Sequence, residues 1–304
     1  MEDEADSCVL SDVHMEACPP LQQGSTWTTT FTLPEAYQAP SQCTSEAAVD
    51  EDGDLVIDRQ SDRSQLTIHH SLKTPLRDVG LQVWRGALPL ADYILGNADL
   101  FRGCMALELG CGSGLAGIVM AMLAERVFLT DIGEAVLGNC QRNVDANSHH
   151  FQAGSQTALV RQMDWLHPEC LQSSAAETPG PFGWSPEDKD QLRTLDVILA
   201  ADTVYDDDLT DAMFKCATLL LSGAQRHMRH QWQGMYIALE KRYNFTVDSM
   251  NVVAPAYEKF KQYFLTGGGR GKFDNSQLRD KLGCSQTIAL HGAQIDTNCY
   301  SIAQ

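Results

Sequence analysis

Several glycines and carboxylates occur at spacings that could bind a nucleoside cofactor. Gly110, Gly112 and Gly114 follow one short apolar run, and Asp131 ends the next. Glycine lets the backbone turn sharply and approach a ligand closely, with N–H groups of the following helix directed at it. A carboxylate at the end of the second strand can accept hydrogen bonds from both ribose hydroxyls. These positions therefore predict a nucleoside-binding strand, turn and helix.

The glycine spacing alone leaves the cofactor class open. Gly112-x-Gly114-x-x-Gly117 with a later acid matches the dinucleotide fingerprint, and the same letters fit an S-adenosylmethionine site. Plain packing of a helix on a sheet is a third interpretation. Glu108 favours S-adenosylmethionine, because a carboxylate suits the ammonium of its methionine part and would repel a pyrophosphate.

Two tryptophans are candidates for contact with the cofactor, one at its adenine ring and the other as a lid over it. Asp164 and Trp165 follow a third apolar run. Asp164 could accept from the exocyclic amine of adenine while Trp165 packs on the ring, although simple packing is the alternative for Trp165. Trp84 precedes a helical pattern at 88–95 and is interpreted either as a core residue or as a lid over the cofactor.

Five short apolar runs are expected to position these residues. The runs lie at 104–109, 127–130, 158–163, 195–201 and 234–240, and helical patterns separate most of them. A proline-rich stretch at 168–190 predicts a long surface loop, and a final helix is expected from about 247 to 264. This order predicts an α/β fold with a doubly wound, mostly parallel, Rossmann-like sheet. Its ligands belong at the carboxyl ends of the strands, where the candidate carboxylates stand.

Composition narrows the function classes. The 304 residues carry a net charge of −18, but residues 1–58 hold 13 acidic residues and no Lys or Arg. The remaining chain is therefore close to neutral, and no basic stripe indicates nucleic acid. Ten cysteines without a C-x-x-C pair or a histidine cluster predict reduced thiols and no metal site. No long apolar run or signal sequence is evident, so we expect the nucleus and/or cytoplasm and no membrane.

The ordered set of motifs resembles the seven-β-strand protein-lysine methyltransferases of the methyltransferase-like group. The motifs are Glu108-Leu109-Gly110-Cys111-Gly112-Ser113-Gly114, Asp131, Asp164-Trp165 and Ala201-Asp202-Thr203-Val204-Tyr205. The resemblance covers about residues 64 to 265. It implies a class I methyltransferase fold and an enzyme that uses S-adenosylmethionine to methylate a lysine on another, non-histone protein. Chaperones are a partner class for that protein substrate.

The resemblance and the residues together give one candidate site. The candidate cofactor-binding residues are Trp84, Glu108, Gly110, Cys111, Gly112, Gly114, Asp131, Asp164, Trp165 and Ala201. Asp202 and Tyr205 match the family's Asp-x-x-Tyr substrate motif. Asp202 is expected to orient the amine or neighbouring backbone, so that Asp202→Ala removes methylation and spares cofactor affinity. Tyr205 would wall the lysine pocket, where an aromatic face tolerates methylated ammonium.

The two ends of the chain are expected to lie outside the enzyme domain. Residues 1–62 predict an acidic, disordered extension, 63–265 the methyltransferase domain, and 266–304 an atypical, disordered tail. The family fold closes with an antiparallel β-hairpin, but the tail offers only Thr287-Ile288-Ala289-Leu290 as a short strand. We therefore expect this hairpin to be altered or missing, which would expose a sheet edge. A catalytically impaired cofactor-binding scaffold, or a methyltransferase for another substrate class, remain alternatives.

Overall fold

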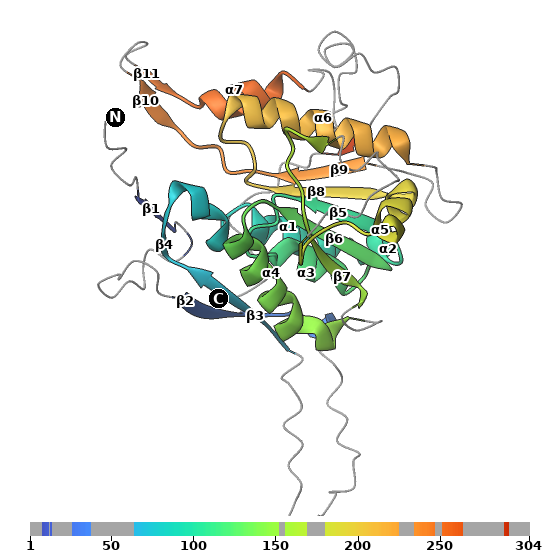
Figure 1. Ribbon diagram of the computed structural model, residues 1–304. Helices are drawn as coiled ribbons and strands as arrows, with labels where there is room; N and C mark the ends of the chain where they lie inside the picture. The colour runs from blue at the N-terminus through green and yellow to red at the C-terminus, as the bar shows by residue number, and fades with distance from the viewer. Residues whose placement is uncertain are drawn as a thin grey trace, which may run out of the picture.

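The protein is organised around one parallel sheet (Figure 1). The computed structural model describes residues 8–11, 13, 26–37, 64–151, 156–168, 180–224, 234–246, 251–263 and 289–291. In this part of the chain the strand order is β12-β9-β8-β5-β6-β7, and every neighbouring pair is parallel. The strands are β5 (Met105–Leu109), β6 (Arg126–Asp131), β7 (Ala158–Gln162), β8 (Val197–Ala201), β9 (Gly234–Ala238) and β12 (Ala289–His291). The predicted α/β fold with a mostly parallel sheet is confirmed.

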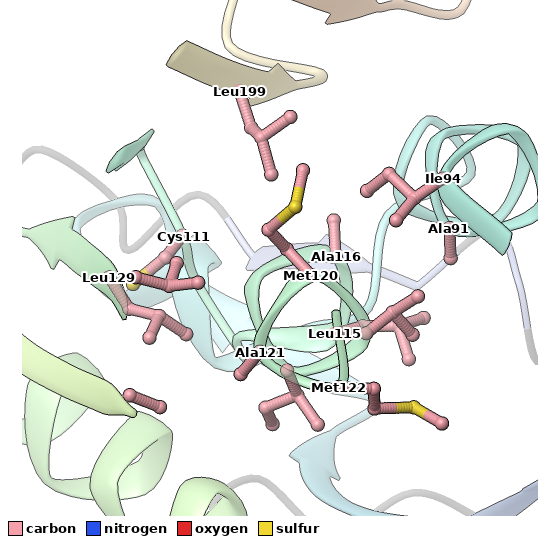
Figure 2. Close-up of a cluster of buried hydrophobic side chains, with 14 of the residues drawn as sticks. Ala91, Ile94, Cys111, Leu115, Ala116, Met120, Ala121, Met122, Leu129 and Leu199 are labelled. Carbon is pink, nitrogen blue, oxygen red and sulfur yellow. The ribbon is translucent and has the colours of Figure 1, made fainter. Parts of the chain in front are cut away.

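Helices cover both faces of the sheet, because each strand is apolar on both sides. The helices are α1 (Ala87–Gly96), α2 (Ala98–Phe101), α3 (Leu115–Ala121), α4 (Glu134–Asn147), α5 (Pro186–Gln191), α6 (Asp207–Gly223) and α7 (Pro255–Lys261). Leu129 and Leu199 point to a core shared with α1, α3 and α4, whereas Phe128 and Ile198 point to a core with α6. Figure 2 shows α3 in the middle of the first core. None of the helices in the described ranges has the length and hydropathy needed to cross a bilayer.

Two strands lie in the segment that was expected to be disordered. β1 (Cys8–Leu10) pairs antiparallel with β4 (Lys73–Pro75), and β2 (Thr26–Thr32) pairs antiparallel with β3 (Gln65–Ser71). The prediction of disorder over 1–62 is therefore wrong for these strands, and most of the remaining range lies outside the described residues. Threonine is β-branched and favours strands, and Phe31 is completely buried in the first core. Pairing with strands far along the chain is a long-range effect that composition does not reveal.

Helix α4 carries a ladder of asparagine side chains that pairs with β3. The Thr67 and His69 N–H groups donate to Asn147 Oδ1 (2.9 Å) and Asn143 Oδ1 (2.7 Å). In return the Asn147 amide donates to Thr67 O, and the Asn139 and Asn143 amides donate to His69 O. Three asparagines spaced four residues apart share one helix face, so they hydrogen-bond to β3 much as a neighbouring strand would. Asn143 also donates to Ser113 O in the glycine-rich turn (2.8 Å).

The second half of the chain differs from the sequence prediction in three places. The helix expected from about 247 is wrong at 251–253, because β11 (Asn251–Val253) pairs antiparallel with β10 (Asn244–Thr246). Pro255 opens α7 instead, since proline lacks the N–H that a first helical position leaves unused. The loop expected over 168–190 ends in α5, whose start is a capping box between Ser185 and Asp188.

The third difference concerns the C-terminal tail. β12 pairs parallel with β9, so the prediction of disorder over 266–304 is wrong for these three residues. Within the described ranges the main sheet contains no antiparallel strand. The closing hairpin that the resemblance implies is therefore not found in this part of the chain, and the other tail residues lie outside the described ranges.

Candidate active site

The turn after β5 is tight and depends on glycine. Gly110, Gly112 and Gly114 have φ angles of 69°, 51° and 87°, in the left-handed region that other residues rarely adopt. A Cβ added at Gly110 would stand 2.8 Å from Thr203 Cγ2 and 3.0 Å from Trp165 Cζ2. The turn therefore brings the ends of β5, β7 and β8 together around bare backbone. Such a turn before a helix is suited to close approach by a ligand.

Cys111 stands inside this turn but does not face solvent. Its side chain is buried, and its thiol lies 3.6 Å from the buried Cys140 Sγ on α4. Burial raises the pKa of the Cys111 thiol, so it remains protonated. The Cys111 N–H donates to Thr130 O (2.9 Å), which ties the turn to β6. Cys111 therefore stabilises the turn through its backbone, and its sulfur is not accessible to a cofactor.

Glu108 is a buried carboxyl group with one free oxygen. Its side chain is 1% exposed, and Oε2 has no hydrogen-bond partner. Burial raises the pKa of Glu108 to about 8, although the Gly117 N–H partly stabilises the charged form. A Cβ at Gly117 would overlap with Oε2, so α3 can approach only with glycine there. A buried acceptor without a partner is costly, and a ligand cation would relieve that cost.

Asp131 is held by the backbone of two neighbouring turns. The Gly112 N–H donates to Oδ2 (2.8 Å) and the Ile132 N–H donates to Oδ1 (2.7 Å). Burial raises the pKa of Asp131, and these two donors lower it. Each carboxylate oxygen keeps a second lone pair, so both can still accept from neighbouring hydroxyls of a ribose.

Two apolar residues near the site were missed from the sequence. Ile132 directly follows Asp131 and is 55% exposed, and Leu166 directly follows Trp165 and is 54% exposed. Both stand at the carboxyl ends of adjacent strands, β6 and β7. The signal in the sequence that could have identified them is an apolar residue within two positions of an acidic residue at a strand end. Such a pair offers apolar contact for one face of a planar ring.

Asp164 and Trp165 occupy the end of β7. The Leu166 N–H donates to Asp164 Oδ1 (2.9 Å), so Asp164 closes its own turn and keeps Oδ2 available. Trp165 lies against Gly110 and packs on the second core, which fits the packing interpretation. Its Nε1 is buried without a partner. Trp165 therefore lines the turn and carries an unused donor.

Asp202 joins three segments at the end of β8. The Gly86 N–H donates to Oδ2 (2.5 Å) and the Glu240 N–H donates to Oδ1 (2.6 Å). Its own N–H donates to Ala238 O (2.8 Å), next to the paired residues Ala201 and Ala238. Burial raises the pKa of Asp202, while the two donors and Arg242 oppose that effect. The backbone has a left-handed φ of 52°, which is rare for a residue other than glycine.

Tyr205 and its acidic neighbours form the outer part of the site. Tyr205 is 54% exposed, and loss of hydration and the charges of Asp131 and Asp206 raise the pKa of its hydroxyl. Asp131 and Tyr205 are thus within electrostatic range across the β6 and β8 ends. Asp206 caps α6 by accepting from the Leu209 N–H (2.9 Å), and Asp211 pairs with Lys259 (2.9 Å). Two acidic residues close to Tyr205 in sequence, Asp206 and Asp211, therefore have structural partners.

Trp84 lies beside the strand ends rather than in either core. Its Nε1 donates to Val79 O (3.0 Å), and the Arg242 guanidinium carbon lies 4.7 Å from the ring centre. The next residue, Arg85, forms an ion pair with Glu240 (3.0 Å). The ring therefore stands between η3 (Leu76–Leu81) and the chain that leaves β9.

The parallel sheet, the glycine turn and the acidic strand ends define a class I methyltransferase. Residues 60–178 match the family described as lysine methyltransferase. The chain is 37% identical to human methyltransferase-like protein 22 over 295 residues, covering 82% of this chain and 71% of the relative. The mouse protein of that name is 43% identical over 215 residues, 69% of this chain and 52% of the relative. The chain belongs to the methyltransferase-like protein 22 family of lysine methyltransferases, and it is an enzyme of that class.

One further relative and one solved structure are also similar to the chain. Mouse protein N-lysine methyltransferase METTL21A is 35% identical over 137 residues, which cover 44% of this chain and 53% of that protein. Among solved structures, magnesium protoporphyrin IX methyltransferase from Synechocystis PCC 6803 with bound SAH has a TM-score of 0.33 and 16% identity. That match covers 65% of this chain and 69% of the other.

Proposed function

We propose that this enzyme uses S-adenosylmethionine to methylate a lysine side chain on a non-histone protein. The observation that carries the proposal is the unpartnered Glu108 Oε2, buried beside the glycine turn and one strand away from Asp131. A dinucleotide pyrophosphate would place negative charge where the free carboxyl oxygen stands. The methionine ammonium places positive charge there.

The residues at the strand ends fit the parts of this cofactor. Glu108 would hold the ammonium, the bare backbone of the glycine turn would lie against the methionine part, and Asp131 would accept from the ribose hydroxyls. Ile132, Leu166 and Trp165 would contact the adenine ring, with Asp164 Oδ2 accepting from its amine. When bound, S-adenosylmethionine supplies a methyl group on a positively charged sulfur.

The residues of the chain would contribute mainly by positioning and by control of charge. A free lysine has a pKa of about 10.4, so its nitrogen must lose a proton before it can accept a methyl group. Partial burial beside Tyr205 disfavours the charged amine. The Tyr205 ring would also attract the methylated ammonium product. Alignment of the two reacting atoms would supply most of the rate.

The protein substrate would approach past Tyr205. Asp207 and Asp208 are exposed in the first turn of α6, where negative charge also favours a helix N-terminus. The same charges would attract a basic stretch around the target lysine. We place this activity in the nucleus and/or cytoplasm, with a protein substrate, chaperones as a first class to screen, and no nucleic acid or membrane partner.

Ligand-dependent unfolding of the full chain tests the proposal. S-adenosylmethionine and S-adenosylhomocysteine should raise the unfolding midpoint, and NAD should not. A ligand at 100 times its dissociation constant stabilises by about 2.7 kcal/mol, which is easily measured. Labelled S-adenosylmethionine and a cell extract should then yield protein-bound methyl groups on lysine, identified by mass spectrometry. No stabilisation by either ligand would refute the cofactor assignment, and binding without transfer would instead support the scaffold alternative.

A further inference from the structure

The segment 76–86, here called the strap, crosses the site from one side to the other. At its first end, Gly80 O lies 3.0 Å from the position of a Cβ at Gly112, and Gly80 also packs on Val136 of α4. At its second end, the Gly86 N–H donates to Asp202. The strap therefore contacts the glycine turn after β5 and the end of β8. These are the two sides of the expected methionine position.

Three consecutive strap residues are fastened to the ends of β8 and β9. Trp84 stacks with Arg242, Arg85 pairs with Glu240, and Gly86 donates to Asp202. The first two contacts involve exposed or partly exposed charges, which contribute little in water. The third is a short hydrogen bond from a buried glycine to a carboxylate, which is a stronger kind of bond. Of these three contacts, the one to Asp202 is thus the strongest.

The hydrogen bonds of Asp202 indicate that its carboxylate accepts from backbone N–H groups. One carboxylate oxygen receives the Gly86 N–H at 2.5 Å, and the other receives the Glu240 N–H at 2.6 Å. Both oxygens therefore hold a short hydrogen bond from a backbone donor before any substrate arrives, and each keeps only its second lone pair. A Cβ at Gly86 would stand 2.8 Å from Asp202 Cγ and 2.9 Å from Ala238 O, so the strap fits here only with glycine.

We propose that Asp202 is a positioning residue that latches the strap over the cofactor and thereby sets how long the cofactor stays bound. The lysine nitrogen does not need its carboxylate. This inference rests on the proposed cofactor. It reverses the sequence expectation, because loss of Asp202 should weaken cofactor retention more than it slows the transfer step.

The test measures dissociation of S-adenosylhomocysteine from the full chain by displacement in a stopped-flow instrument. Asp202→Ala and Asp202→Asn should each raise the dissociation rate at least tenfold. Gly86→Ala should have the same effect with the carboxylate still present. The Gly86 backbone has a φ of −63°, so alanine brings crowding there without backbone strain. In transfer assays over a range of labelled S-adenosylmethionine concentrations, Asp202→Asn should lose more through a raised KM for the cofactor than through a lowered kcat.

Asp196→Ala is the matched control. Asp196 is a buried carboxylate at the opposite end of β8, and it also accepts a backbone N–H, from Met105 (3.0 Å). This variant should lower the unfolding midpoint and leave the dissociation rate unchanged. Unchanged dissociation in Gly86→Ala, or a loss in Asp202→Asn that falls mainly on kcat, would overturn the latch. A wild-type chain that binds no S-adenosylhomocysteine would overturn the cofactor proposal and the latch together.

Discussion

Cofactor affinity should depend on pH through Glu108. The free protein holds this carboxyl group at a pKa of about 8, because it is buried beside Asp131 without a cation. Only the ionised form pairs with the ammonium of the cofactor. From this pKa, about 1% of the side chain is ionised at pH 6, about 10% at pH 7 and about half at pH 8.

The magnitude follows from these fractions. An α-amino group titrates near pH 7.7–8.0 in model compounds. The affinity should therefore rise about twentyfold from pH 6 to pH 8, and it should stop rising above about pH 8, where the ligand loses its charge. Because binding ionises Glu108, close to one proton should be released at pH 7.

Isothermal titration of S-adenosylhomocysteine at several pH values measures this dependence. Repeating the titration in two buffers with different ionisation enthalpies gives the number of protons released. Glu108→Gln keeps the size of the side chain and removes its titration, so it should bind more weakly and with a nearly flat profile up to pH 7. A wild-type affinity that is constant between pH 6 and pH 8, or binding without proton release, would refute the assigned role of Glu108.

Three further predictions follow from the same contacts. Without ligand, the raised pKa of Glu108 contributes stability that is present below about pH 4.5 and is lost as pH rises towards about 8, by up to about 5 kcal/mol. Chemical denaturation should therefore give a free energy of unfolding that depends less on pH in Glu108→Gln than in wild type. Gly110→Ala would place a Cβ against Thr203 and Trp165 at a left-handed φ. This variant should lower the free energy of unfolding by about 1–3 kcal/mol and abolish the rise in unfolding midpoint that the ligand causes. A full rise in the midpoint would contradict the tight turn. Tyr205→Ala should lower the rate of methyl transfer at least tenfold with unchanged S-adenosylhomocysteine affinity. Tyr205→Phe should retain most activity, because the ring rather than the hydroxyl lines the lysine pocket. Equal losses in both variants would point to the hydroxyl instead.

The strand ends were predictable because the chain repeats one local pattern. Glu108, Asp131, Asp164 and Asp202 each stand at or just after the end of a short apolar run, and parallel strands bring such ends to one edge of a sheet. Glycine at 110, 112 and 114 likewise predicts a turn with positive φ angles, which other residues rarely adopt. These features depend on a few neighbouring residues, which a single sequence displays.

The contacts between distant segments were not predictable in this way. The two donors to Asp202 are 116 and 38 residues away in sequence, and the pairing of β2 with β3 joins residues 41 apart at Thr28 and His69. No local pattern states which backbone N–H will meet which carboxylate. The exposed positions of Ile132 and Leu166 also follow from the packed fold rather than from the residue types.

The asparagine ladder on α4, together with the strands β3 and β2 that pair beyond it, determines the shortest part of this chain that should fold stably. Asn143 and Asn147 are completely buried, and β3 supplies a donor and an acceptor to the side chain of each. β3 in turn completes its other edge with β2. A chain cut after Ser71 would leave several buried amide groups unpaired directly behind the glycine turn. A chain that begins at residue 63 would keep β3 but leave its other edge without β2, so the autonomous domain should begin ahead of Thr26.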